Sequence, residues 1–274
     1  MTLQTGNNNL VGIRPPFPTS TIHEIRLCLF QATRRPGKIE KIIVTSFGKV
    51  RIKGRLGQAH LDVFEAICYS RERKKDMDGR IHILVDPWGV RKKSCQFSGS
   101  TLENLLDDLT KASIEIIKPD HLACSGHLID HVDKARRCDD SIITRKGKFG
   151  ERELWTVKLG EAFGKLVKRD VWVGWDPVKI AGLEYGISQA VTRHVLSHKN
   201  APVGGWKIEN LIRAVAGDVS DATRWKHAER LREDAEKMSK IGVLVDKGRV
   251  KLSKNQEPDA KASWSDAKAS IPDT

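Results

Sequence analysis

Apolar and polar residues alternate strictly over residues 49–56 of this chain, in the run KVRIKGRL. This alternation predicts a half-buried β-strand with Val50, Ile52 and Leu56 on its inner face. The opposite face carries a row of cations: Lys49, Arg51, Lys53 and Arg55. Such a row fits contacts to phosphates, and it fits a plain solvent-exposed face equally well.

Helical spacing follows in the rest of the first half. Leucine, phenylalanine and isoleucine recur at helical intervals after Gly57, and Pro87 opens a short helix after the apolar strand RIHILV. A third helix is expected from Ser100 or Thr101 as N-cap, with a buried stripe of leucines at Leu102, Leu105, Leu106 and Leu109. Strands SIEIIK and GHLIDHV come next, which is the element order of a winged helix-turn-helix domain.

The second half repeats this order. A strand over 153–159, a helix over 160–169 and a strand over 170–175 precede two helices that end near residue 200. A helix over 207–217, a long polar helix over 220–242 and a hairpin with Lys247-Gly248 at its tip complete the pattern.

We therefore predict an α+β fold with two tandem winged-helix domains. The expected division is as follows: an N-terminal arm at 1–37, winged-helix domain 1 at 38–150, winged-helix domain 2 at 151–254, and a disordered C-terminal tail at 255–274.

The charge of the chain indicates its partner. The 274 residues include 48 Lys and Arg and 35 Asp and Glu, so the net charge is +13. Residues 1–150 contribute +9 and residues 151–274 contribute +4. This excess favours an extended polyanion, and nucleic acid before a membrane surface, because no apolar run approaches the roughly 20 residues of a spanning helix. The first residues lack the basic and apolar regions of a signal peptide, so we expect a cytoplasmic protein.

Cysteine and histidine do not indicate a metal site. The five cysteines form no CxxC pair, which favours free thiols over a disulfide framework. Cys124, His127, His131 and Cys138 have the residue types of a zinc site, but their spacing matches no zinc module and their segment alternates like a β-ribbon. We expect neither a metal nor a cofactor.

Enzyme motifs are also not found. The string from Gly160 to Leu166 has one residue too few for a P-loop and no hydroxyl after Lys165. Rolling-circle nickases need His-x-His, which does not occur, and the His194–His198 pair lacks the glutamate of H-E-x-x-H. We expect a protein that is not an enzyme.

Cations gather on the elements that would read DNA. In the helix over 220–242, a helical wheel places Trp225, Leu231 and Met238 in one sector and Lys226 and Arg230 opposite. The candidate DNA-contacting residues of its first turns are Thr223, Arg224, Lys226, His227 and Arg230. Further candidates are Lys247 and Arg249 at the hairpin and Arg91, Lys92 and Lys93 in the first half. The alternative for the helix is a solvated amphipathic surface.

From about residue 40 to 254 the chain resembles plasmid replication initiators with two winged-helix domains. The strongest likeness is SDATRWKHAERLREDAEKMSKIG, similar to the final recognition helix of that family; ELWTVKLGEAFGKLV and STLENLLDDLTKASIEI are similar to its inter-domain and first-domain segments. The likeness is to the IncQ RepC-like type and, more distantly, to TrfA, RepA and π.

The resemblance implies a function. Such initiators bind directly repeated origin sequences, called iterons, and open an adjacent AT-rich region. Carried over by position, Thr101 and Asn104 would contact DNA in the first domain, where the acidic pair Asp107-Asp108 implies a smaller contribution. Trp225 departs from the family pattern and is expected to pack. The implied partners are double-stranded iteron DNA, a host replicative helicase or primase, and a second copy of the chain; the alternative is a winged-helix transcriptional repressor.

Overall fold

The structure is a computed structural model of the chain. It describes residues 18–45, 48–70, 72–75, 80–96, 98–118, 121–134, 144–147, 150–167 and 172–253. The predicted tail at 255–274 and the first 17 residues of the predicted arm lie outside the described residues.

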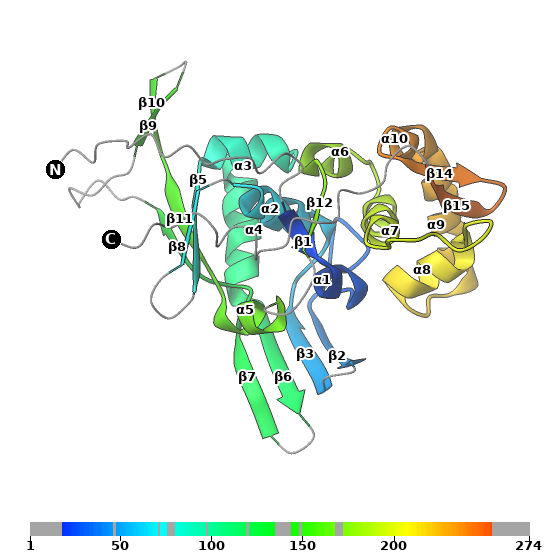
Figure 1. Ribbon diagram of the computed structural model, residues 1–274, viewed down its shortest axis with the longest axis horizontal. Helices are drawn as coiled ribbons and strands as arrows, with labels where there is room; N and C mark the ends of the chain where they lie inside the picture. The colour runs from blue at the N-terminus through cyan, green and yellow to red at the C-terminus, as the bar shows by residue number, and fades with distance from the viewer. Residues whose placement is uncertain are drawn as a thin grey trace.

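Helices occur in both halves of the chain (Figure 1). They are α1 Ile22–Arg26, α2 Gln58–Cys68, α3 Pro87–Lys93, α4 Gly99–Lys111, α5 Glu161–Val167, α6 Pro177–Ala181, α7 Gly186–Leu196, α8 Ile208–Ala216, α9 Asp221–Glu233 and α10 Ala235–Ser239. None of these described helices has the length and apolar character needed to cross a membrane.

The strands form several small sheets, and every ladder between named strands is antiparallel. They are β1 Pro18–Thr21, β2 Ile39–Thr45, β3 Gly48–Gly54, β4 Arg73–Lys75, β5 Ile81–Val85, β6 Ser113–Lys118, β7 His121–His127, β8 Ile129–Lys134, β9 Thr144–Gly147, β10 Gly150–Glu153, β11 Trp155–Leu159, β12 Trp172–Gly174, β13 Trp206–Lys207, β14 Val243–Asp246 and β15 Arg249–Leu252. The architecture is therefore mixed, with helices packed around small antiparallel sheets.

Two of the sheets have the same strand order relative to their helices. The chain order α2, β5, α3, α4, β8, β11 gives a sheet in which β11 lies between β5 and β8. The order α7, β13, α8, α9, β14, β15 gives a sheet in which β15 lies between β13 and β14. In both units the last strand lies between the other two, so one three-stranded topological unit occurs twice; in the first unit β4 extends the sheet beyond β5.

The first unit contains an insertion that the sequence pattern did not predict. The strand expected over 126–132 is divided between the end of β7 and β8. Strands β6 and β7 pair with each other and join the β2–β3 hairpin in a separate sheet of order β2-β3-β6-β7. Strand β11, expected to open the second domain, pairs with β5 and β8. With α5, it packs in the first core, so the buried clusters do not divide at residue 150.

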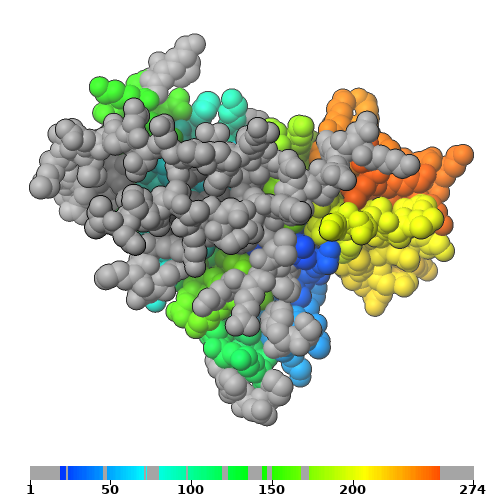
Figure 2. Space-filling model, in the orientation of Figure 1, coloured from blue at the N-terminus to red at the C-terminus, as the bar shows by residue number. Residues whose placement is uncertain are grey.

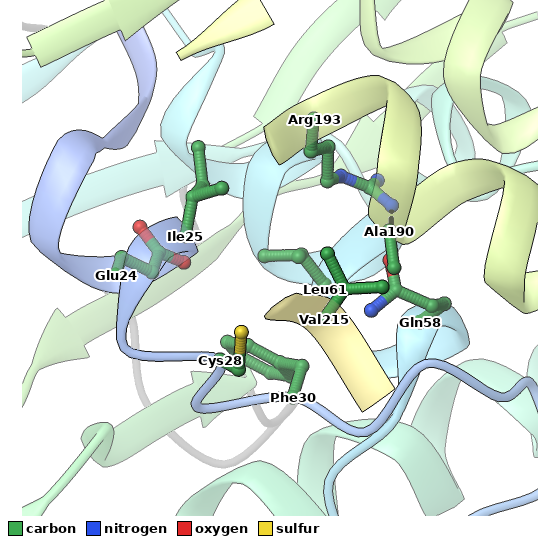
Figure 3. A pocket seen from close by; sticks show the side chains of 9 residues that line it. All are labelled: Glu24, Ile25, Cys28, Phe30, Gln58, Leu61, Ala190, Arg193 and Val215. Carbon is green, nitrogen blue, oxygen red and sulfur yellow. Dashed lines mark hydrogen bonds between the residues drawn. The ribbon is translucent and has the colours of Figure 1, made fainter. Parts of the chain in front are cut away.

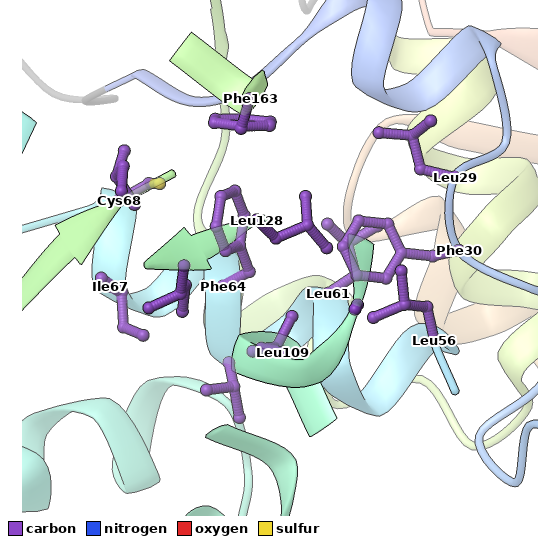
Figure 4. Packing of buried hydrophobic residues seen from close by; sticks show 14 of the residues in the cluster. Leu29, Phe30, Leu56, Leu61, Phe64, Ile67, Cys68, Leu109, Leu128 and Phe163 are labelled. Carbon is purple, nitrogen blue, oxygen red and sulfur yellow. The ribbon is translucent and has the colours of Figure 1, made fainter. Parts of the chain in front are cut away.

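The first core is centred on α2. Phe64 is fully buried and meets Phe163 edge-to-face with ring centroids 5.0 Å apart, while Phe30 lies 6.4 Å away (Figure 4). The inner residues of β3, Val50 and Ile52, are 0% and 1% exposed, which confirms the strand pattern. Burying such side chains contributes about 1.5–3 kcal/mol each.

The second core contains α7, α8 and the β14–β15 hairpin, with Ile212, Leu231 and Val250 fully buried. The segment before β2 takes part in both cores, since Phe30 belongs to the first and Ile25 to the second. Residues 18–32 of the predicted arm are therefore integrated into the fold. Figure 2 shows the C-terminal elements, yellow to red, as a lobe at one end of the molecule.

Candidate nucleic-acid interface

Helix α9 begins at a well-defined cap. The Ser220 side chain accepts a hydrogen bond from the backbone N–H of Thr223 at 3.3 Å, and Gly217, with a φ of +75°, ends α8. A serine N-cap stabilises a helix start by satisfying a free N–H group. Ser220 and Gly217 therefore define the boundary between α8 and α9.

The other end of α9 is tied to α7. Asp234 is 1% exposed, and its carboxylate accepts hydrogen bonds from the backbone N–H groups of Glu184 at 3.2 Å and Tyr185 at 3.1 Å, just before α7 begins. The helix predicted over 220–242 is interrupted at this residue and divides into α9 and α10. The carboxylate therefore fixes the position of α9 on the second core.

Arg230 packs at the same contact between the end of α9 and the start of α7. Its guanidinium lies 5.3 Å from the centroid of the Tyr185 ring, a distance that allows a cation–π contact. A hydrogen bond to Glu233 raises the pKa of Tyr185 to about 12, which keeps the hydroxyl protonated at neutral pH. Arg230 is half-buried in this position, so the structure shows it stabilising α9 against α7, and its contact with DNA stays a prediction.

Three other predicted residues of α9 are also half-buried. The Arg224 guanidinium donates to Asp221 at 2.8 Å and to the Val219 carbonyl at 3.2 Å. The Thr223 hydroxyl lies 2.9 Å from the Ser220 hydroxyl. Burial, and then the charge of Arg230, lowers the pKa of His227, whose Nδ1 has no hydrogen-bond partner among the described residues.

The exposed residues of α9 are Asp221, Ala222, Trp225, Lys226, Arg232 and Glu233. The Trp225 side chain is 65% exposed, so the expectation that it packs is wrong. Leu231 is the buried residue of α9. Helical periodicity shows which residues share a face, but the neighbours α7 and α8 decide which face is covered. Of the five predicted contact residues, Lys226 is the one that faces solvent.

The β14–β15 hairpin lies beside this helix. Lys247 and Gly248 form its tip with φ values of +44° and +75°, as a two-residue hairpin turn requires. Lys247 is exposed, whereas Arg249 donates to the carbonyls of Gly204 at 3.3 Å and Gly205 at 3.1 Å. Lys247 is thus an exposed cation at the hairpin tip, and its contact with DNA stays a prediction.

The first-half cations lie in the last turn of α3. Lys92 lies 5.4 Å from the centroid of the Trp88 ring, and Arg152 of β10 lies 4.5 Å from it. Lys93 lies 5.8 Å from the ring of Tyr69, and Arg91 is half-buried. Lys92, Lys93 and Arg152 therefore lie against aromatic rings rather than in a free row. Sequence reasoning missed Arg152, because only the fold brings β10 to α3.

Helix α4 presents an acidic side. Asn104 is exposed and Thr101 half-buried. Each acidic residue near them has a cation or an imidazole: Glu103 with Lys134 at 3.1 Å, Asp107 with Lys111 at 2.5 Å, and Asp108 with His60 at 3.2 Å. The positive charge near α4 comes from its own last residue, Lys111, and from Lys134 of β8. The smaller role of this helix in base reading stays a prediction.

The cation row on β3 is largely paired within its own sheet. Arg51 lies 2.9 Å from Glu115 of β6, and Lys53 lies 3.2 Å from Glu40 of β2. These pairs favour the solvent-face interpretation over phosphate contact. The predicted contact residues thus fall into two groups, one on α3 and α4 and one on α9 and its hairpin, with α2 and α7 between them (Figure 1).

The fold has a counterpart among solved structures. No family model matches the chain, and no curated protein sequence does. The chain is similar to a crystal structure of domain 2 and domain 3 of RctB with a TM-score of 0.50 and 10% identity, over 85% of this chain and 96% of that one. A second RctB domains 2–3 structure aligns with a TM-score of 0.39 and 10% identity, over 83% and 93%. The chain therefore shares the fold of RctB domains 2 and 3.

The residues considered for zinc do not assemble in the part of the chain that the structure describes. The His127 ring lies 3.3 Å from the carbonyl of Ala112, and Cys124 lies at the carbonyl of Ser125. Cys138 lies outside the described residues. No three His, Cys, Asp or Glu side chains among those described come together as metal ligands.

We expect Asp234→Ala to lower the free energy of unfolding by about 2–3 kcal/mol, because two backbone N–H groups lose a charged acceptor that is itself buried. Urea denaturation followed by circular dichroism measures this. Asp246→Ala is the matched control: Asp246 is exposed and lies 3.5 Å from Lys251, and such a pair contributes at most about 1 kcal/mol. Equal losses in the two variants would show that Asp234 does not anchor α9.

Proposed function

We propose that this chain is a non-enzymatic, sequence-specific double-stranded DNA-binding protein that initiates replication. The observation that carries the proposal is α9, a helix of 13 residues with Leu231 as its buried residue, beside a hairpin with Lys247 at its tip. A helix held at both ends and left open along one side is suited to a major groove, which admits an α-helix.

The repeated topological unit supports two winged-helix domains. In each unit, three helices are followed by an antiparallel hairpin whose last strand pairs with the strand between the first two helices. On this interpretation α4 and α9 are the recognition helices. The wings are the β14–β15 hairpin and the hairpin from β8 to β11, which β9 and β10 extend.

The likeness to RctB supports the fold on which this proposal rests. This chain shares the fold of two RctB domains. At 10% identity a shared fold does not transfer a binding site. The choice of DNA as partner therefore rests also on the net charge of +13 and on the exposed side of α9.

In the bound state, Ala222, Trp225 and Lys226 would face the groove floor or its phosphate edge. Trp225 offers a large apolar surface for thymine methyl groups, Lys226 reaches phosphate or guanine, and Ala222 leaves room for close approach. Bending and opening a neighbouring AT-rich region costs free energy, since distorting a site takes on the order of 1–6 kcal/mol. Binding of several copies to iterons would supply this free energy. A host helicase or primase would then load; a second copy of the chain, as a homodimer, is the other proposed partner.

A transcriptional repressor could use the same two modules. Footprinting on the DNA that flanks the gene, combined with permanganate probing of unpaired thymines, distinguishes the two functions. We expect protection of direct repeats and reactive thymines in an adjacent AT-rich stretch. Protection of a single inverted repeat with no reactive thymines would identify a repressor instead.

We expect Trp225→Ala to weaken binding to the protected sequence by about 1–3 kcal/mol, which is about 5–150-fold, and to leave binding to scrambled DNA nearly unchanged. Lys226→Ala should weaken binding to both duplexes and lower the salt slope by about one. Lys165→Ala is the control, because Lys165 lies on α5 and pairs with Glu161 at 2.7 Å. Equal binding by the Trp225 variant and the wild type would exclude this side of α9 from readout.

A further inference from the structure

A buried arginine joins the two cores. Arg193 of α7 is 1% exposed, and its guanidinium donates four hydrogen bonds to α2. Glu65 accepts two of them at 2.9 and 2.8 Å, Asp62 accepts one at 2.6 Å, and the Gln58 side-chain oxygen accepts one at 2.6 Å. The planar guanidinium is therefore fixed in both distance and angle.

The carboxylates have further donors from other elements. The Ser20 hydroxyl of β1 donates to Glu65 at 2.9 Å, and the Gln189 amide of α7 donates to Asp62 at 3.2 Å. Both carboxylates are 0% exposed. A charge cluster so fully removed from water is weak evidence of net stability, but it strongly favours one geometry over others that would break its bonds.

The space beside the cluster is filled. Residues near Thr33 pass between the starts of α2 and α7: a Cβ on Gly57 would lie 2.5 Å from the Thr33 carbonyl oxygen, and one on Gly186 would lie 2.6 Å from the Thr33 Cα. Next to Arg193 and Gln58 there is a cavity of about 20 Å³, lined also by Glu24 and Cys28 (Figure 3). Such a volume holds roughly one water molecule, so it leaves the helices little freedom to shift.

The cluster lies on the path between the two candidate recognition helices. Helix α4 packs on α2, α2 packs on α7, and α7 packs on α9. Figure 1 shows α2 and α7 between α4 and α9. The contact between α2 and α7 is the step at which this path crosses from the first core to the second, and Arg193 is its charged centre.

We infer that Arg193 is a positioning residue that sets the spacing between the two DNA segments this protein binds. This inference rests on the proposed function. Each inserted base pair moves one segment by about 3.4 Å along the duplex and turns it by about one tenth of a helical turn. A rigid joint cannot follow that movement, whereas a loosened joint can, at the cost of affinity for the native spacing.

The test measures affinity on a series of duplexes that carry the footprinted sequence with zero to five base pairs inserted between its two protected segments. The proteins are the full-length wild type, R193M and R193K. R193K keeps the positive charge but loses the planar guanidinium and its fixed set of N–H donors. We expect the wild type to lose at least about 10-fold with two inserted base pairs, and the variants to lose less than about 3-fold, from a weaker starting affinity. If R193M does not fold, the spacing profile of R193K is compared with that of the wild type.

Each outcome has one meaning. Parallel spacing profiles for the wild type and a folded variant would overturn the inference and leave the proposed function intact. A wild type with no preferred sequence would overturn the proposed function and the inference with it. Small-angle scattering of the free proteins gives a DNA-independent readout: we expect a larger maximum dimension for R193K, and an unchanged scattering profile would count against a loosened joint.

Discussion

Arg193→Met should lower the free energy of unfolding by about 3–5 kcal/mol, one of the two largest effects expected from a change in this chain. The substitution leaves the carboxyl groups of Asp62 and Glu65, both 0% exposed, without their main partner. Each group must then hold an unpaired charge away from water or take up a proton, and both cost free energy. Urea denaturation at pH 7 measures the loss. Arg213→Met is the control, because Arg213 is exposed and its pair with Asp218, at 3.5 Å, contributes at most about 1 kcal/mol.

The origin of this loss can be separated from simple loss of contacts. In the triple variant R193M/D62L/E65M the buried charges are removed together, and such replacements are often neutral or stabilising. We expect the triple variant to regain at least half of the stability that R193M loses. A triple variant less stable than R193M would show that packing, and not the unpaired charge, determines the effect.

The second large effect is a loss of stability in mild acid. Burial, together with the charges of His198 and Arg26, lowers the pKa of His194 from 6.5 to about 4. Above pH 6.5 the ring is neutral in both the folded and the unfolded chain. Between pH 6.5 and 4 the unfolded chain binds the proton and the folded chain does not, so stability falls as the pH falls, by up to about 2–3 kcal/mol.

His194→Gln should remove this part of the pH dependence, because glutamine does not titrate. Burial lowers the pKa of the neighbouring His198 too, and the two rings lie 4.8 Å apart. H194Q/H198Q should therefore flatten the curve further. Urea denaturation at several pH values from 7 to 4 gives the free energy of unfolding of the variant and of the wild type. Effects of carboxylates that both proteins share cancel in the difference between them. A curve for H194Q that is parallel to the wild type would mean that His194 titrates normally in the folded protein.

Local patterns in the sequence predict much of this fold. Alternation around Val50 and Ile52 marks β3, the leucine stripe marks α4, and Lys247-Gly248 marks a hairpin tip. Each of these depends on residues within one element, where side-chain periodicity and turn chemistry act directly. The domain limits at 37/38, 150/151 and 254/255 stay predictions, although the cores show that β11 belongs with the first half.

What could not be predicted depends on contacts between distant residues. Periodicity in α2 shows the apolar face of Leu61 and Phe64, but Asp62 and Glu65 are equally buried, because Arg193 lies against them. Nothing near α2 in the sequence signals that partner. The exposure of Trp225 has the same origin, since α7 and α8 cover the other side of α9.

The candidate interface was likewise predictable in part. The sequence pattern correctly located a capped helix and a hairpin with cations, but it could not show that Arg224 and Arg230 have partners within the protein. Net charge alone does not distinguish a paired cation from an available one. The structure leaves Lys226 as the exposed residue among the predicted contacts of α9, with Ala222 and Trp225 exposed beside it.

Competition binding at 150 mM salt tests sequence-specific DNA recognition most directly. The protein is titrated against a labelled duplex of the footprinted sequence, with unlabelled specific or scrambled duplex of equal length and composition as competitor. We predict that the specific duplex binds at least about 1,000-fold more tightly, and that both affinities fall with rising salt. Equal competition by the two duplexes would contradict sequence-specific recognition, and with it the proposed initiator function.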